Sequence, residues 1–98
     1  MIELRIFEDE TGKMNLSVND VAGEILLVSQ FTLYANCDRG RRPDFIAAAK
    51  PAISEPLYQR LAIVLGERGI NPSMGIFGAD MQIELLNDCP VTIILDRE

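Results

Sequence analysis

The sequence predicts a small α/β fold of about five mostly antiparallel strands and two helices. Near both ends of the chain apolar residues alternate with polar ones, whereas between residues 54 and 68 they recur at helical spacing. The 98 residues suffice for a single domain over residues 1–98. A chain of this size buries only about two-thirds of the surface that its unfolded form exposes, so a partner subunit would enlarge a marginal core.

The N-terminal part predicts a β-hairpin. "IELRIF" at 2–7 alternates as a strand does, "DETG" at 9–12 is typical of a turn, and "KMNLSV" at 13–18 reads as the returning strand. After "NDVAG" breaks the chain, we expect one long strand from about Glu24 to Ala35.

Two helices are expected next. "NCDRGRRPD" at 36–44 is a polar loop, and Asp44 can cap a short helix over "FIAAAK", which Pro51 would end. Ser54 can cap a second helix that runs to about Arg68 and stops at Gly69. The apolar face of this second helix would consist of Leu57, Leu61, Val64 and Leu65.

The C-terminal part predicts two more strands. "MQIELLN" at 81–87 alternates as a half-buried strand does, and "VTIILD" at 91–96 reads as a buried one.

The expected strand at 24–35 is unusual because Ser29, Gln30 and Thr32 place hydrogen-bonding side chains in it. A buried amide or hydroxyl without a partner costs roughly 1–3 kcal/mol, so these groups are either satisfied internally or kept for a ligand. In a regular strand, one face would hold Leu27, Ser29, Phe31 and Leu33, and the other Val28, Gln30, Thr32 and Tyr34.

Composition excludes several classes of site. There is no histidine, which removes Ser-His-Asp and Cys-His catalysis and the commonest metal ligand, so we expect no metal site. The carboxylates at 8–10 crowd into a turn and read as a solvated loop. Cys37 and Cys89 form no CxxC pair and favour free thiols in a reducing cytoplasm.

Charge and hydropathy limit the partners. No apolar run approaches the roughly 18 residues that span a bilayer, and no signal sequence precedes the first strand, so we expect a soluble cytoplasmic protein with no membrane partner. The net charge of −6 argues against a general polyanion binder. Only "RGRR" clusters cations, at Arg39, Arg41 and Arg42, and it reads either as a solvated turn or as a local nucleic-acid contact.

Four motifs resemble the D-aminoacyl-tRNA deacylase family. They are "SQFTL" at 29–33, "GRRPDF" at 40–45, "FGADM" at 77–81 and "NDCPVT" at 87–92, and "LRIFEDETGKMNLSV" at 4–18 extends the likeness to essentially the whole chain. The resemblance implies a β-barrel-like α/β homodimer without a cofactor. It also implies an enzyme of translation proofreading that hydrolyses the ester of D-aminoacyl-tRNA, or of glycine mischarged on tRNA, to free amino acid and tRNA.

The resemblance also implies the site residues. Ser29, Gln30, Phe31 and Thr32 would surround the scissile ester at the 3′ end of the tRNA. A Gly-cisPro dipeptide from the other subunit excludes L-amino acids in the family. The residues implied for substrate binding and chiral selection are Cys89, Pro90, Val91, Thr92 and Phe77.

The implied chemistry is substrate-assisted, because no histidine can activate Thr32 as a nucleophile. In this account the ribose 2′-hydroxyl of the terminal adenosine helps to activate water. Backbone N–H groups near Phe31 and Thr32 then form the oxyanion site.

Two departures from the family pattern matter. Cys89 stands where the family has glycine, although a cis bond before Pro90 remains accessible at about 0.5–1 kcal/mol. Family members also begin with further strands and a helix. The chain therefore resembles an N-terminally truncated domain that corresponds to the C-terminal two-thirds of the usual family domain. Because of both departures, a second hypothesis stands beside an active deacylase. In this alternative the chain is a non-catalytic remnant of the family that binds tRNA ends or dimerises.

Overall fold

The computed structural model describes residues 1–88 and 91–96, in two compact units. The terminal unit comprises Met1–Ala22 and Asp80–Glu98, and the central unit comprises Gly23–Ala79. Within the described residues, no helix is both long and apolar enough to cross a membrane.

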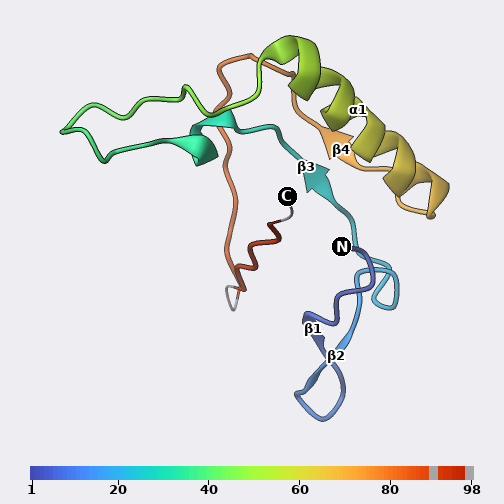
Figure 1. Ribbon diagram of the computed structural model, residues 1–98. Helices are drawn as coiled ribbons and strands as arrows, with labels where there is room; N and C mark the ends of the chain where they lie inside the picture. The colour runs from blue at the N-terminus through green and yellow to red at the C-terminus, as the bar shows by residue number, and fades with distance from the viewer. Residues whose placement is uncertain (89–90, 97–98) are drawn as a thin grey trace. The chain divides into compact units, whose positions relative to one another are not determined.

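The terminal unit contains the expected hairpin. Strands β1 (Phe7–Glu8) and β2 (Met14–Leu16) pair antiparallel, with an irregularity in register between Phe7 and Glu8 (Figure 1). The prediction of a hairpin is therefore confirmed, although both strands are shorter than the alternation suggested. Ile2 and Val18 are buried in this unit and form its small apolar core.

The hairpin turn is organised by the carboxylate of Asp9. Its Oδ1 accepts hydrogen bonds from the backbone N–H of Thr11 (2.9 Å), the Thr11 hydroxyl (2.7 Å) and the backbone N–H of Lys13 (3.0 Å). Its Oδ2 accepts a bond from the side-chain amide of Asn15 at 2.8 Å. A short acidic residue in this position lets the chain reverse without a buried core beneath the turn.

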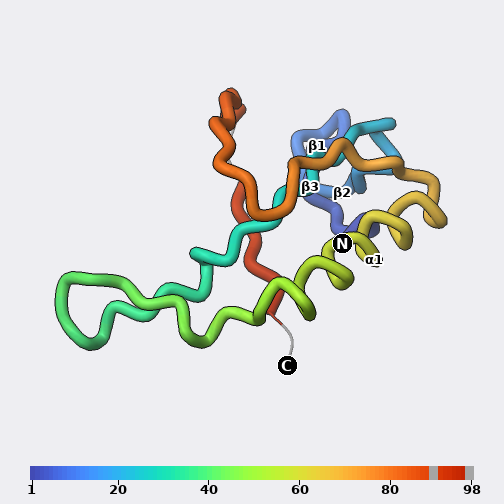
Figure 2. Tube along the Cα trace, turned by 90° about the horizontal axis from the view of Figure 1, so that it is seen from above, coloured from blue at the N-terminus to red at the C-terminus, as the bar shows by residue number. Residues whose placement is uncertain are grey.

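The central unit is built from one parallel strand pair and one long helix. β3 (Leu26–Leu27) pairs with β4 (Ser73–Met74), and α1 (Pro51–Glu67) lies between them in sequence. Figure 2 shows the chain that follows α1 reversing its direction and returning beside β3. A parallel pair requires a long crossover, and the helix supplies it.

The end of α1 is a Schellman motif. Gly69 has φ +93°, the N–H of Ile70 donates to the carbonyl of Leu65 (2.9 Å), and the N–H of Gly69 donates to that of Gly66 (3.1 Å). Leu65 and Ile70 are both buried, which supplies the apolar contact that accompanies this motif. The expected stop at Gly69 is confirmed.

The start of α1 differs from the expectation. Pro51 does not end a helix but opens this one, because its fixed φ suits the first helical position. Ser54 is not the cap. It lies in the first turn, where its hydroxyl donates to the carbonyl of Lys50 at 3.1 Å. Leu57, expected on the buried face, is 64% exposed.

The short helix over 45–50 was also predicted wrongly. A single turn forms there, with the N–H of Ala48 donating to the carbonyl of Phe45 at 3.0 Å. Lys50 precedes a proline, which disfavours helical angles, and it is extended (φ −67°, ψ 154°). The described part of the chain thus has one α-helix rather than two.

The long strand expected at 24–35 is the largest correction. Strand pairing ends at Leu27, and Phe31–Tyr34 form a 3-10 helix, η1. A strand persists only where a neighbour satisfies its backbone, and period-two alternation does not reveal whether one exists. The two-face assignment therefore fails from Phe31 onward.

The C-terminal segments form no strand within residues 81–88 and 91–96. Ile83, Leu85 and Ile94 are exposed there rather than buried. The small α/β class stands, whereas the described residues form one antiparallel and one parallel pair and no closed barrel. The expectation of a mostly antiparallel, barrel-like sheet is not met in this part of the chain.

Candidate functional site

Ser29 to Thr32 leads from β3 into η1, at the surface of the central unit. Ser29 and Thr32 are half-buried, whereas Gln30 and Phe31 are exposed. The side-chain amide of Gln30 donates a hydrogen bond to the Thr32 hydroxyl. The hydroxyl thus has a partner inside the segment, and Gln30 still presents its carbonyl oxygen to an incoming ligand.

The backbone of the same segment has two N–H groups free. In η1, Leu33 donates to the carbonyl of Gln30 (3.4 Å) and Ala35 to that of Thr32 (3.2 Å). Within the described residues, the N–H groups of Phe31 and Thr32 have no backbone acceptor, as expected at the first turn of a helix. Two adjacent donors of this kind can stabilise a developing oxyanion.

Phe77 lies in the same unit and packs against α1. Its ring centroid is 5.9 Å from that of Tyr58, at 44° between the ring planes. The Tyr58 hydroxyl donates to the carbonyl of Leu27 at 3.0 Å, with the carbonyl of Gly75 a second, longer acceptor at 3.4 Å. Phe77 is therefore attached, through Tyr58, to the strand that leads into Ser29.

Tyr58 was missed by sequence reasoning. It lies three residues before Leu61 and seven before Leu65, on the face of α1 that turns toward the unit's core. A tyrosine at a core-facing helical position brings a hydroxyl that needs an acceptor, and this signal was available in the sequence.

The residues of the motif "NDCPVT" at 87–92 belong to the terminal unit. Cys89 and Pro90, including the bond expected to be cis, lie outside the described residues. Val91 and Thr92 are exposed. The structure brings Ser29, Gln30, Phe31 and Thr32 together as one segment, with Phe77 in the same unit.

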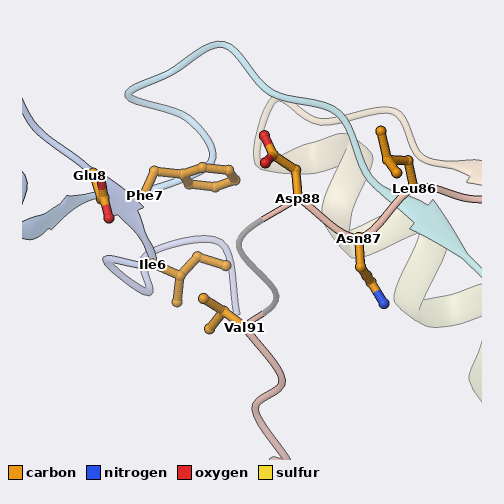
Figure 3. A pocket seen from close by; sticks show the side chains of 7 residues that line it. All are labelled: Ile6, Phe7, Glu8, Leu86, Asn87, Asp88 and Val91. Atoms are coloured by element: carbon orange, nitrogen blue, oxygen red, sulfur yellow. The ribbon is translucent and has the colours of Figure 1, made fainter.

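An open concavity of about 510 Å³ adjoins this motif within the terminal unit. Figure 3 shows its lining, in which apolar side chains from the hairpin face the segment on either side of positions 89–90. The lining residues are Ile6, Phe7, Glu8, Leu86, Asn87, Asp88 and Val91. A mixed lining of four apolar side chains, two carboxylates and one amide can hold a small polar molecule that has an apolar part.

Two carboxylates of this unit, those of Asp9 and Asp20, serve the fold. The four donors to Asp9, above all the Thr11 hydroxyl, hold the pKa of its carboxyl far below the ordinary range. The backbone N–H of Ser17 (2.8 Å) and the Ser17 hydroxyl (3.0 Å) lower the pKa of Asp20 in the same way. Groups that hold their protons so weakly are poor general bases at neutral pH.

Comparison with known proteins identifies the family. The family of the D-Tyr-tRNA(Tyr) deacylase matches residues 1–96. Two curated relatives named D-aminoacyl-tRNA deacylase are 59% identical over 97% of this chain (Geobacillus sp. strain WCH70) and 57% identical over 95% of it (Thermus aquaticus). The chain spans 62% and 61% of their respective lengths.

A solved structure shares the fold. The c-Myc DNA Unwinding Element Binding Protein is 42% identical, with a TM-score of 0.86, over 99% of this chain and 66% of its own length. Family match, relatives and fold agree over nearly every residue. The chain therefore belongs to the D-Tyr-tRNA(Tyr) deacylase family.

Proposed function

We propose that this protein hydrolyses the ester bond of D-aminoacyl-tRNA, and of glycine mischarged on tRNA, releasing free amino acid and tRNA. The observation that carries the proposal is the family match over residues 1–96, together with relatives of that name at 59% and 57% identity. The activity would remove wrongly charged tRNA in the cytoplasm during translation.

The proposed chemistry uses the segment from Ser29 to Thr32. The free N–H groups of Phe31 and Thr32 would hold the carbonyl oxygen as negative charge develops on it, while the substrate's own ribose 2′-hydroxyl helps to activate water. The Thr32 hydroxyl, which accepts a bond from Gln30, acts as a positioning group rather than as the nucleophile. The reaction as proposed requires no cofactor.

Selection against L-amino acids is proposed for Cys89 and Pro90, flanked by Val91 and Thr92. Backbone carbonyls of this dipeptide would occupy the space that an L side chain needs. Phe77 would border the aminoacyl group, and its contact with Tyr58 supports that role by fixing its ring.

A homodimer with a site composed from both subunits is part of the proposal. Several large apolar side chains in the described residues are more than four-fifths exposed, which a second subunit could cover. They are Leu33, Ile46, Leu86 and Ile94, at 84%, 89%, 91% and 87% exposure.

The test measures the release of labelled amino acid from D- and L-aminoacyl-tRNA by the purified protein. The proposal expects multiple turnovers on the D-ester and on glycine mischarged on tRNA, with the L-ester spared. Protection of the D-ester from spontaneous hydrolysis would instead identify a non-catalytic protein that binds tRNA ends. Equal release with and without protein would reject both functions.

A further inference from the structure

The loop from Asn36 to Asp44 is closed at its base. The N–H of Asn36 donates to the carbonyl of Asp44 at 2.8 Å, and the N–H of Asp44 donates to that of Asn36 at 2.9 Å. Inside the loop, the Asn36 side chain accepts a bond from the N–H of Asp38 at 2.8 Å. Figures 1 and 2 both show this loop projecting beyond η1, away from α1 of the same unit.

The closed loop displays three guanidinium groups. Arg39, Arg41 and Arg42 are all exposed, and none of them forms an ion pair within the described part of the chain. Gly40, at φ +110°, makes the bend between the first and the other two. The loop has two acidic residues, Asp38 and, at its base, Asp44, against three arginines, so positive charge prevails at its tip.

The acidic remainder of the chain does not cancel this local charge. The chain carries a net charge of −6, yet charges on exposed groups are largely screened beyond about 8–10 Å at physiological salt. A loop that projects from its unit therefore presents its own charges to a partner. Arginine, rather than lysine, favours paired hydrogen bonds to phosphate oxygens.

Aromatic rings lie beside the base of the loop. Phe45, which follows Asp44, contacts Phe31 of η1 edge to face, with centroids 5.1 Å apart at 75°. Phe31 and Tyr34 of η1 are each 62% exposed. Exposed rings next to cationic side chains are the combination that binds unpaired nucleotides, through base stacking and phosphate contacts.

We propose that the loop from Asn36 to Asp44 is an RNA-binding surface whose three arginines contact consecutive backbone phosphates of a single-stranded end. Exposed rings of η1 stack on the unpaired bases there. That the RNA is tRNA rests on the proposed function, whereas RNA binding itself does not. The loop would then set the affinity for the nucleic acid while Ser29 to Thr32 act on the ester.

The test uses fluorescence anisotropy with a labelled RNA hairpin that ends in a single-stranded 3′ CCA. The triple variant R39Q/R41Q/R42Q is compared with K13Q/R60Q/R68Q, which removes the same charge at other exposed positions. The loop variant is expected to bind at least tenfold more weakly. The slope of log K against log salt concentration should be about 2 less steep for the loop variant than for the parent protein. The reason is that the variant loses three single-strand phosphate contacts, each of which contributes about 0.7 to the slope. The control variant should lose less than threefold.

A conservative variant separates charge from general damage to the loop. R39K/R41K/R42K keeps the three charges and should retain most of the salt dependence, with circular dichroism verifying that all variants fold. An equal loss of affinity in the loop and control variants, or a loop variant within twofold of the parent, would overturn the proposal. Loop-dependent binding to phosphatidylserine vesicles without RNA binding would also overturn it.

A second measurement separates this inference from the proposed function. On D-aminoacyl-adenosine, which has the ester but no RNA backbone, R39Q/R41Q/R42Q should keep the parental kcat/KM, while on D-aminoacyl-tRNA its KM should rise about tenfold. Unchanged values on both substrates would overturn the inference and leave the deacylase standing. RNA binding that depends on the loop, without hydrolysis of either ester, would support the RNA-binding surface and reject the deacylase function.

Discussion

The hydroxyl of Tyr58 donates a hydrogen bond to the carbonyl of Leu27 at 3.0 Å, across 31 residues of sequence. This bond joins α1 to the β3–β4 pair, in which each strand has only two residues. So short a ladder supplies little stability by itself, and the helix has to hold it in place. Leu27 stands two residues before Ser29, so the same bond fixes where the proposed site begins.

Tyr58→Phe should lower the free energy of unfolding by about 1 kcal/mol, because it removes this bond and keeps the ring. Urea denaturation measures the change. Tyr34→Phe is the matched control, since the exposed Tyr34 hydroxyl forms no hydrogen bond to the described residues. Its effect should stay within about 0.5 kcal/mol. Equal effects of the two variants would mean that water replaces the Tyr58 bond at no cost.

Gly69→Ala should destabilise the protein by roughly 1–2 kcal/mol, because a Cβ is strained at φ +93°. Crowding is not the obstacle, since no described atom beyond Gly69 and its chain neighbours lies within 4 Å of the position that the Cβ would take. Gly69→Asn should cost less, because asparagine tolerates left-handed angles better than alanine. Thermal unfolding of both variants checks the order. An alanine variant as stable as the asparagine variant would show that the helix end can rearrange.

Asp9→Ala should destabilise the hairpin in a pH-dependent way. Hydrogen bonding lowers the pKa of Asp9 in the folded state, so its contribution is fully present above its unfolded pKa of about 3.9. That contribution is lost as the pH falls through the lower folded pKa.

The difference in stability between parent and Asp9→Ala should therefore be largest near neutral pH and shrink below about pH 4. Urea unfolding at several pH values measures it, with the exposed neighbour Glu10→Gln as control. A difference that stays constant down to the lowest pH would indicate that the charge of Asp9 plays no part.

Thr32→Ala should reduce deacylation less than Gln30→Ala does. Positioning, rather than attack by the threonine hydroxyl, is proposed to carry the rate, and Gln30 is the donor in the bond between them. Single-turnover hydrolysis of D-aminoacyl-tRNA compares the two variants. Trapping an acyl ester on Thr32 would contradict the substrate-assisted account.

Cys89→Gly should raise hydrolysis of the D-ester, because glycine removes a Cβ from the dipeptide proposed to exclude L-amino acids. A tenfold gain would correspond to about 1.4 kcal/mol of transition-state stabilisation. Paired rates on D- and L-aminoacyl-tRNA measure it, with glycyl-tRNA as the substrate without a side chain. Identical rates and selectivity in parent and variant would show that the cysteine is accommodated.

Local signals determined the hairpin and the end of α1. Asp9 and the residues around it form the turn through bonds within six positions of each other, and Gly69 ends the helix through bonds within the last turn. Such features depend on neighbouring residues alone, so the sequence suffices to predict them. The four motifs in their order likewise indicated the family, and "SQFTL" among them gave the residues now proposed to act on the ester.

Tertiary structure alone decided what the alternating segments became. The apolar pattern at 24–35 fits a strand, yet β3 ends at Leu27 and η1 follows, because a strand exists only beside a partner that pairs with its backbone. The pairing of Leu26 with Ser73 spans almost half of the chain, and no local signal encodes it. Tyr58 shows the same limit. The sequence suffices to predict that Tyr58 lies on the core-facing side of a helix, whereas its hydrogen-bond acceptor on β3 depends on how α1 packs against a strand distant in sequence.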